Sequence, residues 1–375
     1  MNATVKPTAL GMDVAKNVFQ LHWIEPDTGE IRNIRLRRAK LLEFFGNRAP
    51  MLVGMEACGG SQHWARELIK LGHQVRLLPG KEVKKFVTGN KSDAIDAQAI
   101  WQALQQPRAH FVPVKTELQQ AVLALHRMRQ QLVKIRTMQI NALRGLLTEY
   151  GEVFARGRKP MVQGIAQALE RVAQRVPRLV VDTLAQLWAR VQQLDQEVAV
   201  IEHRLREMLK QDALALRLIE IPGVGLLNAT ALSAAMGDPH TFRSGRHFAA
   251  WLGLVPAHEG TGGKTRLKAI SKRGDTYLRT QLIHGARSIL THTKNPSEWQ
   301  QQMSARRPVN VVVVAIANKL ARTVWAIAAH GSRYQPGGPP RPSPDVDMAQ
   351  AAPGRSGHVR SVAAAGQPQG FASPG

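Results

Sequence analysis

Two long stretches of the chain repeat mostly apolar residues at gaps that alternate between three and four. The first stretch places Leu118, Ala121, Leu125, Met128, Leu132, Ile135, Gln139, Ala142 and Leu146 in this register. The second stretch does the same with Leu184, Leu187, Val191, Leu194, Val198, Ile201, Leu205 and Met208. A 3.5-residue period is that of a coiled-coil seam, so we predict a helical coiled-coil segment over residues 115–212. An ordinary amphipathic helix of a bundle would give a similar pattern, and this alternative stays open.

Basic residues of the first stretch fall outside its predicted seam. They are Arg127, Arg129, Lys134, Arg136 and Arg144. In these positions they are free to contact phosphates, although solvation of the outer helix face alone would also explain them. A further helix is expected within residues 151–176, between the two stretches.

The first 110 residues have a different texture, with short apolar runs separated by turn residues and helical patterns. We expect strands over residues 8–12, 18–24, 32–36, 51–55 and 74–78, and a helix over 61–71. The first three strands follow one another in hairpin order, and the last two are joined by the helix. This order predicts an α/β domain with a mixed sheet over residues 1–110.

Residues 213–332 predict a third, all-α domain. It opens with Ile221-Pro-Gly-Val-Gly and a helix of small residues over 226–236, a pattern that resembles a helix–hairpin–helix element. In such an element the backbone N–H groups around Gly223 and Gly225 bind a phosphate without reading base sequence. A plain turn between two helices, with glycine for tight packing, is the alternative. Residues 333–375 are rich in Pro, Gly, Ala and Ser, and we predict a disordered tail.

The charge balance points to a polyanionic partner. The chain has 51 Lys and Arg residues against 27 Asp and Glu, a formal net charge of +24, and nucleic acid is the partner that such an excess predicts. The single cysteine, Cys58, cannot form an intramolecular disulfide, which favours a reducing, cytoplasmic location. The longest apolar run, residues 311–317, is much shorter than the ~20 residues that span a bilayer, so no membrane partner is expected.

Four acids stand at positions where they can converge. Asp13 and Glu56 end two predicted strands, and Asp93 and Asp96 lie three residues apart at the start of a predicted helix. A cluster of carboxylates repels itself unless a cation binds or pKa values rise. Hard oxygen ligands suit Mg²⁺ or Mn²⁺, so the four acids are both the predicted metal ligands and the predicted catalytic residues. The alternative for Asp93 is a helix N-cap, a role that Ser92 would fill equally well.

The motifs around these acids resemble those of the insertion-sequence-110 family of transposases. They are Gly11-Met-Asp-Val-Ala-Lys, Gly54-Met-Glu-Ala-Cys-Gly and Lys91-Ser-Asp-Ala-Ile-Asp-Ala. The resemblance continues through Ile221-Pro-Gly-Val-Gly, Phe248-Ala-Ala-Trp-Leu-Gly-Leu-Val-Pro, Gly262-Gly-Lys and Ile270-Ser-Lys-Arg-Gly-Asp, and covers residues 8–330. It implies an RNase H-like, RuvC-like N-terminal domain that carries the Asp-Glu-Asp-Asp set.

The resemblance also implies a hydroxyl nucleophile in the C-terminal domain. The family has a serine five residues after the proline of its Gly-Leu-x-Pro motif, which here is Pro256. The matching residue is Thr261, a departure from the serine pattern. Thr265 and Ser271 are the substitutes, and a glycine loop that binds phosphate without attacking it is the alternative. Four cations around this position would favour the charge that develops on phosphate. They are Lys264, Arg266, Lys272 and Arg273.

The resemblance therefore implies a DNA transposase or recombinase, working as a homo-oligomer with a structured guide RNA. Two other functions stay open. One is a metal-dependent junction endonuclease that hydrolyses DNA with the four acids alone. The other is a non-catalytic DNA-binding protein that assists inversion or shapes DNA.

Overall fold

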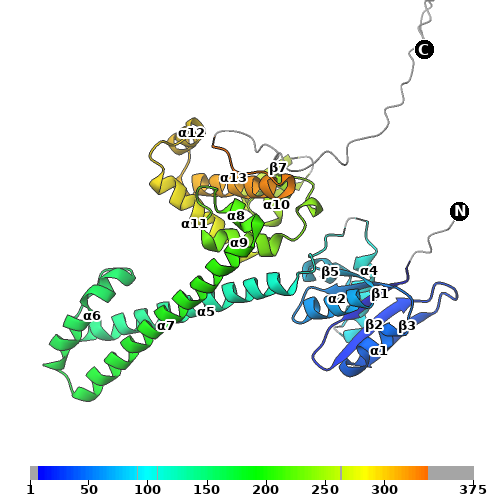
Figure 1. The fold of residues 1–375 in the computed structure, drawn as a ribbon, viewed down its shortest axis with the longest axis horizontal. Coiled ribbons are helices and arrows are strands. Elements are labelled where there is room, and N and C mark those ends of the chain that lie inside the picture. The colour runs from blue at the N-terminus through cyan, green and yellow to red at the C-terminus, as the bar shows by residue number, and fades with distance from the viewer. Residues whose placement is uncertain (1–6, 91, 108, 262–263, 337–375) are drawn as a thin grey trace, which may run out of the picture.

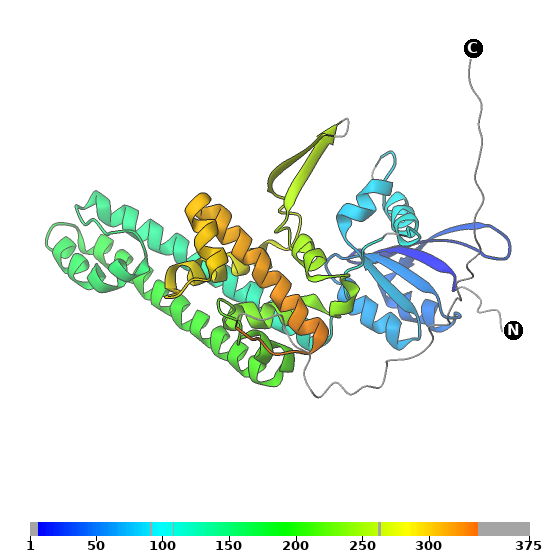
Figure 2. The ribbon, with the colours of Figure 1, turned by 90° about the horizontal axis from the view of Figure 1, so that it is seen from above.

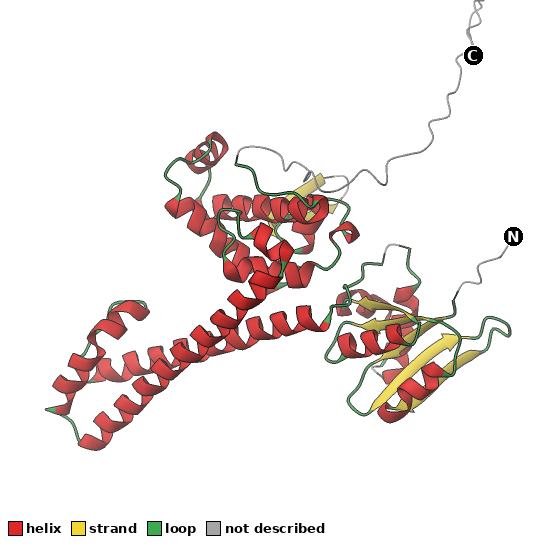
Figure 3. Cartoon of the chain, viewed as in Figure 1, coloured by secondary structure: helices red, strands yellow, loops and turns green. Residues whose placement is uncertain are grey.

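The computed structural model describes residues 7–90, 92–107, 109–261 and 264–336. Three parts follow one another along the chain: a mixed α/β domain, a pair of long helices, and a mainly helical C-terminal domain (Figures 1 and 3). Of the predicted tail, residues 333–375, the structure describes only residues 333–336.

The N-terminal domain has a five-stranded sheet in the order β3-β2-β1-β4-β5. Its strands are β1 (Ala9–Asp13), β2 (Val18–Ile24), β3 (Ile31–Arg37), β4 (Leu52–Glu56) and β5 (Gln74–Leu78). β1 pairs antiparallel with β2, and β2 with β3, whereas β1–β4 and β4–β5 are parallel. The predicted strands and the mixed sheet are confirmed. The run of buried residues in β1 and β4 explains their apolar sequences, since both faces of these strands are covered.

Helices cover both faces of this sheet. They are α1 (Leu41–Gly46), α2 (Ser61–Lys70), α3 (Gly80–Val83) and α4 (Asp93–Leu104), with short 3₁₀ turns at Arg38–Lys40 and Lys84–Phe86. α1 and α2 supply Phe45, Trp64 and Leu68 to the larger core, which also contains Phe19 of β2. α4 packs on the opposite face, where Ile100 joins a second core.

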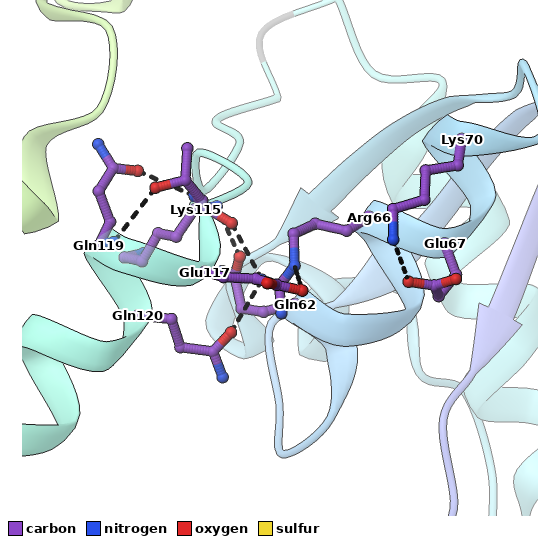
Figure 4. A network of polar contacts seen from close by, with 9 residues as sticks. Gln62, Arg66, Glu67, Lys70, Lys115, Glu117, Gln119 and Gln120 are labelled. Carbon is purple, nitrogen blue, oxygen red and sulfur yellow. Dashed lines mark hydrogen bonds and ion pairs between the residues drawn. The ribbon is translucent and has the colours of Figure 1, made fainter.

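The N-terminal domain is fastened to the long helices by a polar network (Figure 4). The Gln62 side chain of α2 accepts a hydrogen bond of 2.7 Å from the backbone N–H of Lys115. Arg66, one turn along, donates to the Lys115 carbonyl (3.0 Å) and to the Gln120 amide oxygen (2.8 Å). These bonds hold the connecting segment against α2 and set where the first long helix leaves the domain.

The middle segment consists of α5 (Glu117–Glu149), α6 (Arg158–Ala173) and α7 (Arg178–Gln211), with α5 and α7 packed along each other (Figure 1). A capping box at Thr116 and Gln119 begins α5. The predicted seam of α7 is confirmed: Leu184, Val191, Leu194, Val198, Ile201 and Leu205 are buried.

The predicted seam of α5 has the wrong register, although two of its members, Leu125 and Leu132, are half-buried against the core between α5 and α7. Leu118, Met128 and Leu146 are 56, 51 and 44% exposed, and the buried side chains are Val122, His126, Ile140, Leu143 and Leu147. This second series also has gaps of three and four when Arg129, Val133 and Arg136 are included, so the true seam lies one residue after the predicted one. Apolar counting missed it because three of its positions are polar or charged.

Those polar seam residues have partners on α7 or in the C-terminal domain. Arg129 pairs with Glu202 at 2.7 Å and Arg136 with Asp195 at 2.6 Å. His126 lies within hydrogen-bond distance of the hydroxyls of Thr230 (2.9 Å) and Tyr277 (2.8 Å). The prediction that Arg129 and Arg136 are free to contact phosphates is therefore wrong. Arg144 is also engaged, since it donates to the Gly157 carbonyl at 2.9 Å, whereas Arg127 and Lys134 are exposed.

The C-terminal domain contains α8 (Ala213–Leu218), α9 (Leu226–Met236), α10 (Gly245–Trp251), α11 (Thr276–His292), α12 (Glu298–Arg306) and α13 (Val309–His330), with a 3₁₀ turn at Pro239–Thr241. α9 is buried on nearly every side and forms the centre of the core with α11 and α13. The domain is not all-α as predicted, because β6 (Pro256–Thr261) and β7 (Lys264–Ile270) form an antiparallel hairpin that projects from its body (Figure 2).

α13 extends well past the apolar run that we singled out. It has the length and composition of a membrane-crossing helix. Its buried side, which includes Val313, Ile316 and Leu320, belongs to the core of the C-terminal domain, and Lys319 and Arg322 lie near its middle. Its apolar character is thus explained by packing inside the domain.

Candidate active site

Two of the four acids are brought together by the parallel pairing of β1 and β4. Met12 and Met55 are partners in this pairing, so Asp13 and Glu56 follow them at the same carboxyl edge of the sheet. Gly11 and Gly54, two residues earlier on each strand, both face α4. Because side chains alternate along a strand, Asp13 and Glu56 lie on the α4 side as well.

The other two acids arrive with α4, which crosses the sheet very closely. A Cβ on Gly11 would lie 2.3 Å from the Ala97 carbonyl oxygen, and one on Gly54 would lie 3.0 Å from the Leu104 side chain. Trp101 donates to the Ala9 carbonyl at the start of β1 and Ala97 lies over Gly11, so the helix runs with its first turn, Asp93 and Asp96, toward the carboxyl end of β1. Ser92 is the N-cap and accepts a hydrogen bond from the Ile95 N–H at 3.3 Å, so Asp93 is not needed as a cap.

The other three acids lie near enough to Asp13 for their charges to act on it. Burial raises the pKa of Asp13, and the charges of Asp96, Asp93 and Glu56 raise it further, while the Val14 N–H lowers it. Glu56 rests against the backbone of Gly80, where an added Cβ would lie 2.5 Å from its Oε1 atom. The acids thus share one side of the sheet edge.

These acids are not neutralised by the protein itself. In a chain with 51 Lys and Arg residues, no ion pair among the described residues involves any of the four. Nor, within the described ranges, do three acid, His or Cys side chains come close enough to hold one metal ion. The chemistry of the donor set, four hard carboxylates without a basic partner, nevertheless fits Mg²⁺ or Mn²⁺. The arrangement is an open cluster of carboxylates around the edge of the sheet.

Sequence reasoning missed one neighbour of this cluster, Cys58. Although Cys58 is exposed, partial desolvation of its thiol and the charges of Glu56 and Asp13 raise its pKa, so the thiol stays protonated at neutral pH. Its position two residues after Glu56 was the available signal.

The C-terminal hairpin holds the predicted nucleophile at its tip. β6 ends at Thr261, whose partner across the hairpin is Lys264, the first residue of β7. The side chains of Thr261, Lys264 and Thr265, and all of Gly262 and Gly263, lie outside the described residues. Arg266 is exposed on β7, and no hydrogen bond or ion pair among the described residues joins the hairpin to the four acids.

Comparison with known proteins agrees with this arrangement. Residues 10–152 match a family model for DEDD transposases of the IS110 group, and residues 215–303 match the model described as "Transposase IS116/IS110/IS902 family". The chain is 44% identical over 333 residues to a "Probable family 20 transposase" of Pseudomonas aeruginosa, covering 88% of this chain and 98% of the relative. It is 39% identical over 335 residues to the transposase for insertion sequence element IS1111A of Coxiella burnetii, covering 88% and 91%.

The chain belongs to the IS110 family of transposases. It is therefore an enzyme of DNA transposition and binds DNA, and the family's DEDD acids imply divalent-metal catalysis.

The basic turn of the transposase beside its hairpin is rigidly built. Lys272 and Arg273 are exposed, and the Lys272 backbone has a φ of 53°, in the left-handed region that non-glycine residues seldom occupy. The buried Arg279 donates to the carbonyls of Leu252 (3.1 Å) and Gly274 (3.2 Å) and so holds the two sides of this turn together. The partly buried Ser271 anchors the end of β7 through its N–H, which bonds to Val255 at 2.8 Å.

The two glycines between α8 and α9 have different surroundings. Gly223 has a φ of +82°, and a Cβ on it would lie 2.8 Å from the Gly285 carbonyl of α11, so tight packing accounts for this glycine. Gly225 is exposed at the N-terminus of α9 with open space around it. A phosphate contact stays a prediction for both residues, and the structure leaves room for one at Gly225.

Proposed function

We propose that this transposase cuts and joins DNA by metal-assisted phosphoryl transfer in a RuvC-like N-terminal domain. The observation that carries the proposal is that three further carboxylates lie near enough to Asp13 for their charges to act on it, and that no ion pair among the described residues neutralises any of the four. Asp13, Glu56, Asp93 and Asp96 would hold Mg²⁺ or Mn²⁺, which when bound supplies a positive charge for the oxygens of the scissile phosphate. The hairpin order of β1–β3 followed by parallel β4 and β5 supports the RNase H-like assignment.

In this proposal the fold of the protein holds the four acids in fixed positions relative to one another. The sheet register fixes the spacing of Asp13 and Glu56, and the packing of α4 on Gly11 and Gly54 fixes Asp93 and Asp96 relative to them. The free N–H groups of the first turn of α4 also favour negative charge near that end of the helix.

The nucleophile in this proposal is the hydroxyl of Thr261. Its oxygen forms a bond to phosphorus, the phosphorus–oxygen bond to the departing DNA strand breaks, and the proton of Thr261 ends on the departing hydroxyl or on solvent. The product is a covalent protein–DNA ester. Thr261 ends β6 directly before a glycine pair, and Arg266 is exposed on the opposite strand, which supports this role. The expectation that Lys272 and Arg273 surround Thr261 is wrong, because they lie at the base of the hairpin, where the Lys272 N–H bonds to the Gly253 carbonyl.

A homo-oligomer, with the hairpin of one subunit serving the acids of another, is part of the same proposal. The exposed apolar stripe of α5, which includes Leu118, Met128 and Leu146, has the spacing of a helix–helix seam and supports it. A guide RNA encoded by the element and a cytoplasmic location are proposed from the family resemblance, the +24 charge and the lone cysteine.

The test is a strand-transfer assay with the element's own DNA ends and RNA, trapped under denaturing conditions. Transposition by this route needs divalent metal and leaves a protein–DNA adduct. Metal-dependent cutting without any adduct would favour the hydrolytic endonuclease, and binding without cutting would favour the non-catalytic protein.

A further inference from the structure

A row of side chains leads from the acid cluster across the sheet to its free edge. Asp13 of β1 is the register partner of Gln20 of β2, and Gln20 is the partner of Arg35 of β3. Directly opposed residues in antiparallel strands point to the same face. Arg35 therefore lies on the α4 face of the sheet, in line with the acids, and Arg37 follows two residues later on the same face.

The cover that α4 gives this face ends before β3. On β2, Gln20 and His22 are 7 and 4% exposed, and the His22 ring lies edge-on to Trp101 of α4 with centroids 5.5 Å apart. On β3, by contrast, Arg35 and Arg37 are exposed. Asn33, which accepts a hydrogen bond from the Gln20 side chain, marks the border between the two zones.

Arg35 and Arg37 also differ from the arginine on the other face of the same strand. Arg32 is paired with Glu30 at 2.9 Å and lies 4.0 Å from Glu25. No ion pair or side-chain hydrogen bond within the described part of the chain involves Arg35 or Arg37. Two uncompensated cations thus stand beside uncompensated acids, separated from them by one buried strand.

We infer that Arg35 and Arg37 bind the phosphate backbone of the DNA strand whose scissile phosphate lies at the four acids. Strands are about 4.8 Å apart, so the Cα atoms of Arg35 and Asp13 are separated by about 10 Å. The contacted phosphate therefore lies on the same strand within about three nucleotides of the cut. This inference rests on the proposed function, because it takes the acid cluster as the place of cutting.

Charge on an edge strand has a second use, since it hinders pairing with another sheet. Arg32 would serve that purpose as well as Arg35 and Arg37, because all three project from β3. The DNA-binding role predicts that arginines on the α4 face contribute to DNA affinity and that an arginine on the opposite face does not. This difference makes Arg32 the matched control.

The experiment measures binding of the full-length protein to a short fluorescein-labelled DNA duplex of random sequence at several salt concentrations. Arg35→Gln with Arg37→Gln should weaken binding about tenfold or more, and should lower the slope of log affinity against log salt by about 2. Arg32→Gln should change affinity less than twofold. Arg35→Lys with Arg37→Lys should restore the salt slope, which separates lost charge from lost folding.

Unchanged DNA binding by the double glutamine variant would overturn the inference, as would an equal loss in Arg32→Gln. A loss confined to an RNA hairpin probe would overturn the assignment to DNA. Asp13→Asn is assayed in parallel for cutting: if that variant still cuts DNA, the proposed function fails, whereas failure of the arginine variants alone leaves it intact.

Discussion

The acid cluster and the C-terminal hairpin hold their reactive groups in opposite ways. Asp13 and Glu56 end two buried parallel strands, and α4 is locked onto them by glycines that allow almost no gap. Thr261 ends an exposed two-stranded hairpin that no third strand supports among the described residues. Isolated hairpins of two strands have little stability of their own. The difference indicates that the backbone carrying the acids is fixed by packing, and that in the proposed mechanism the hydroxyl is carried to them.

The largest loss of strand transfer should come from substitutions in the acid cluster. Asp13→Asn and Glu56→Gln should each reduce strand transfer by about 10³-fold or more, because a metal site contributes several kcal/mol to phosphoryl transfer. DNA binding should stay within about twofold of wild type. Gel assays of transfer and binding on the same preparations check both; loss of binding together with activity would show that the acids support the fold rather than the chemistry.

Replacing the hydroxyl of the hairpin tests the other half. Thr261→Val keeps the branched shape and removes the oxygen, so the covalent protein–DNA adduct should disappear, whereas Thr261→Ser should retain it. Mass spectrometry of the DNA-linked peptide is the measurement. Thr265→Val is the control, and an adduct mapped to Thr265 or Ser271 would move the nucleophile.

A smaller effect is expected from loosening α4. Gly11→Ala places a methyl group 2.3 Å from the Ala97 carbonyl and should lower the free energy of unfolding by about 1–3 kcal/mol, with loss of strand transfer. Gly46→Ala, with open space around it, is the control and should change stability by about 0.5 kcal/mol or less. Denaturant unfolding followed by circular dichroism measures both, and equal stability of the two variants would contradict a backbone fixed by packing.

The smallest effect concerns the charge of Asp13. Because its pKa is raised in the folded protein, the ionised form costs stability at neutral pH, and that cost disappears as pH falls through the raised pKa. At pH 7, Asp13→Asn should therefore have a free energy of unfolding up to about 1 kcal/mol higher than wild type, for a half-exposed site, and should unfold at a higher temperature. The two proteins should converge in acid. Added Mg²⁺ should stabilise the wild type more than Asp13→Asn; equal unfolding temperatures at every pH and metal concentration would contradict the electrostatic cluster.

The two long helices show where pattern reasoning from sequence succeeds. The seam of α7 was predicted correctly because its buried positions are all apolar, from Leu184 to Leu205. On α5, the packed side includes His126, Arg129 and Arg136. Their partners are distant in the sequence, namely Thr230, Glu202 and Asp195. No local count reveals that a charged side chain has a partner across the packing, so the more apolar series was chosen, and several of its members, such as Leu118 and Met128, are exposed.

The hairpin β6–β7 was missed for a related reason. Both of its faces are largely exposed, so its strands lack the alternation of apolar and polar residues that marks a half-buried strand. The glycine pair at 262–263 between two short polar segments was the available signal for a hairpin.

The sequence by itself determined the parts of this protein that local chemistry decides. Its apolar runs predicted β1, β4 and β5. The acids at the ends of two strands and at the start of a helix predicted a cluster of carboxylates. The family followed from the motifs around these acids. Only the tertiary structure decided which stripe of α5 is buried, which arginines are neutralised, and that Arg35 lies in line with Asp13. Each of these depends on a contact between residues distant in the chain, and a contact of that kind exists only after the elements have packed.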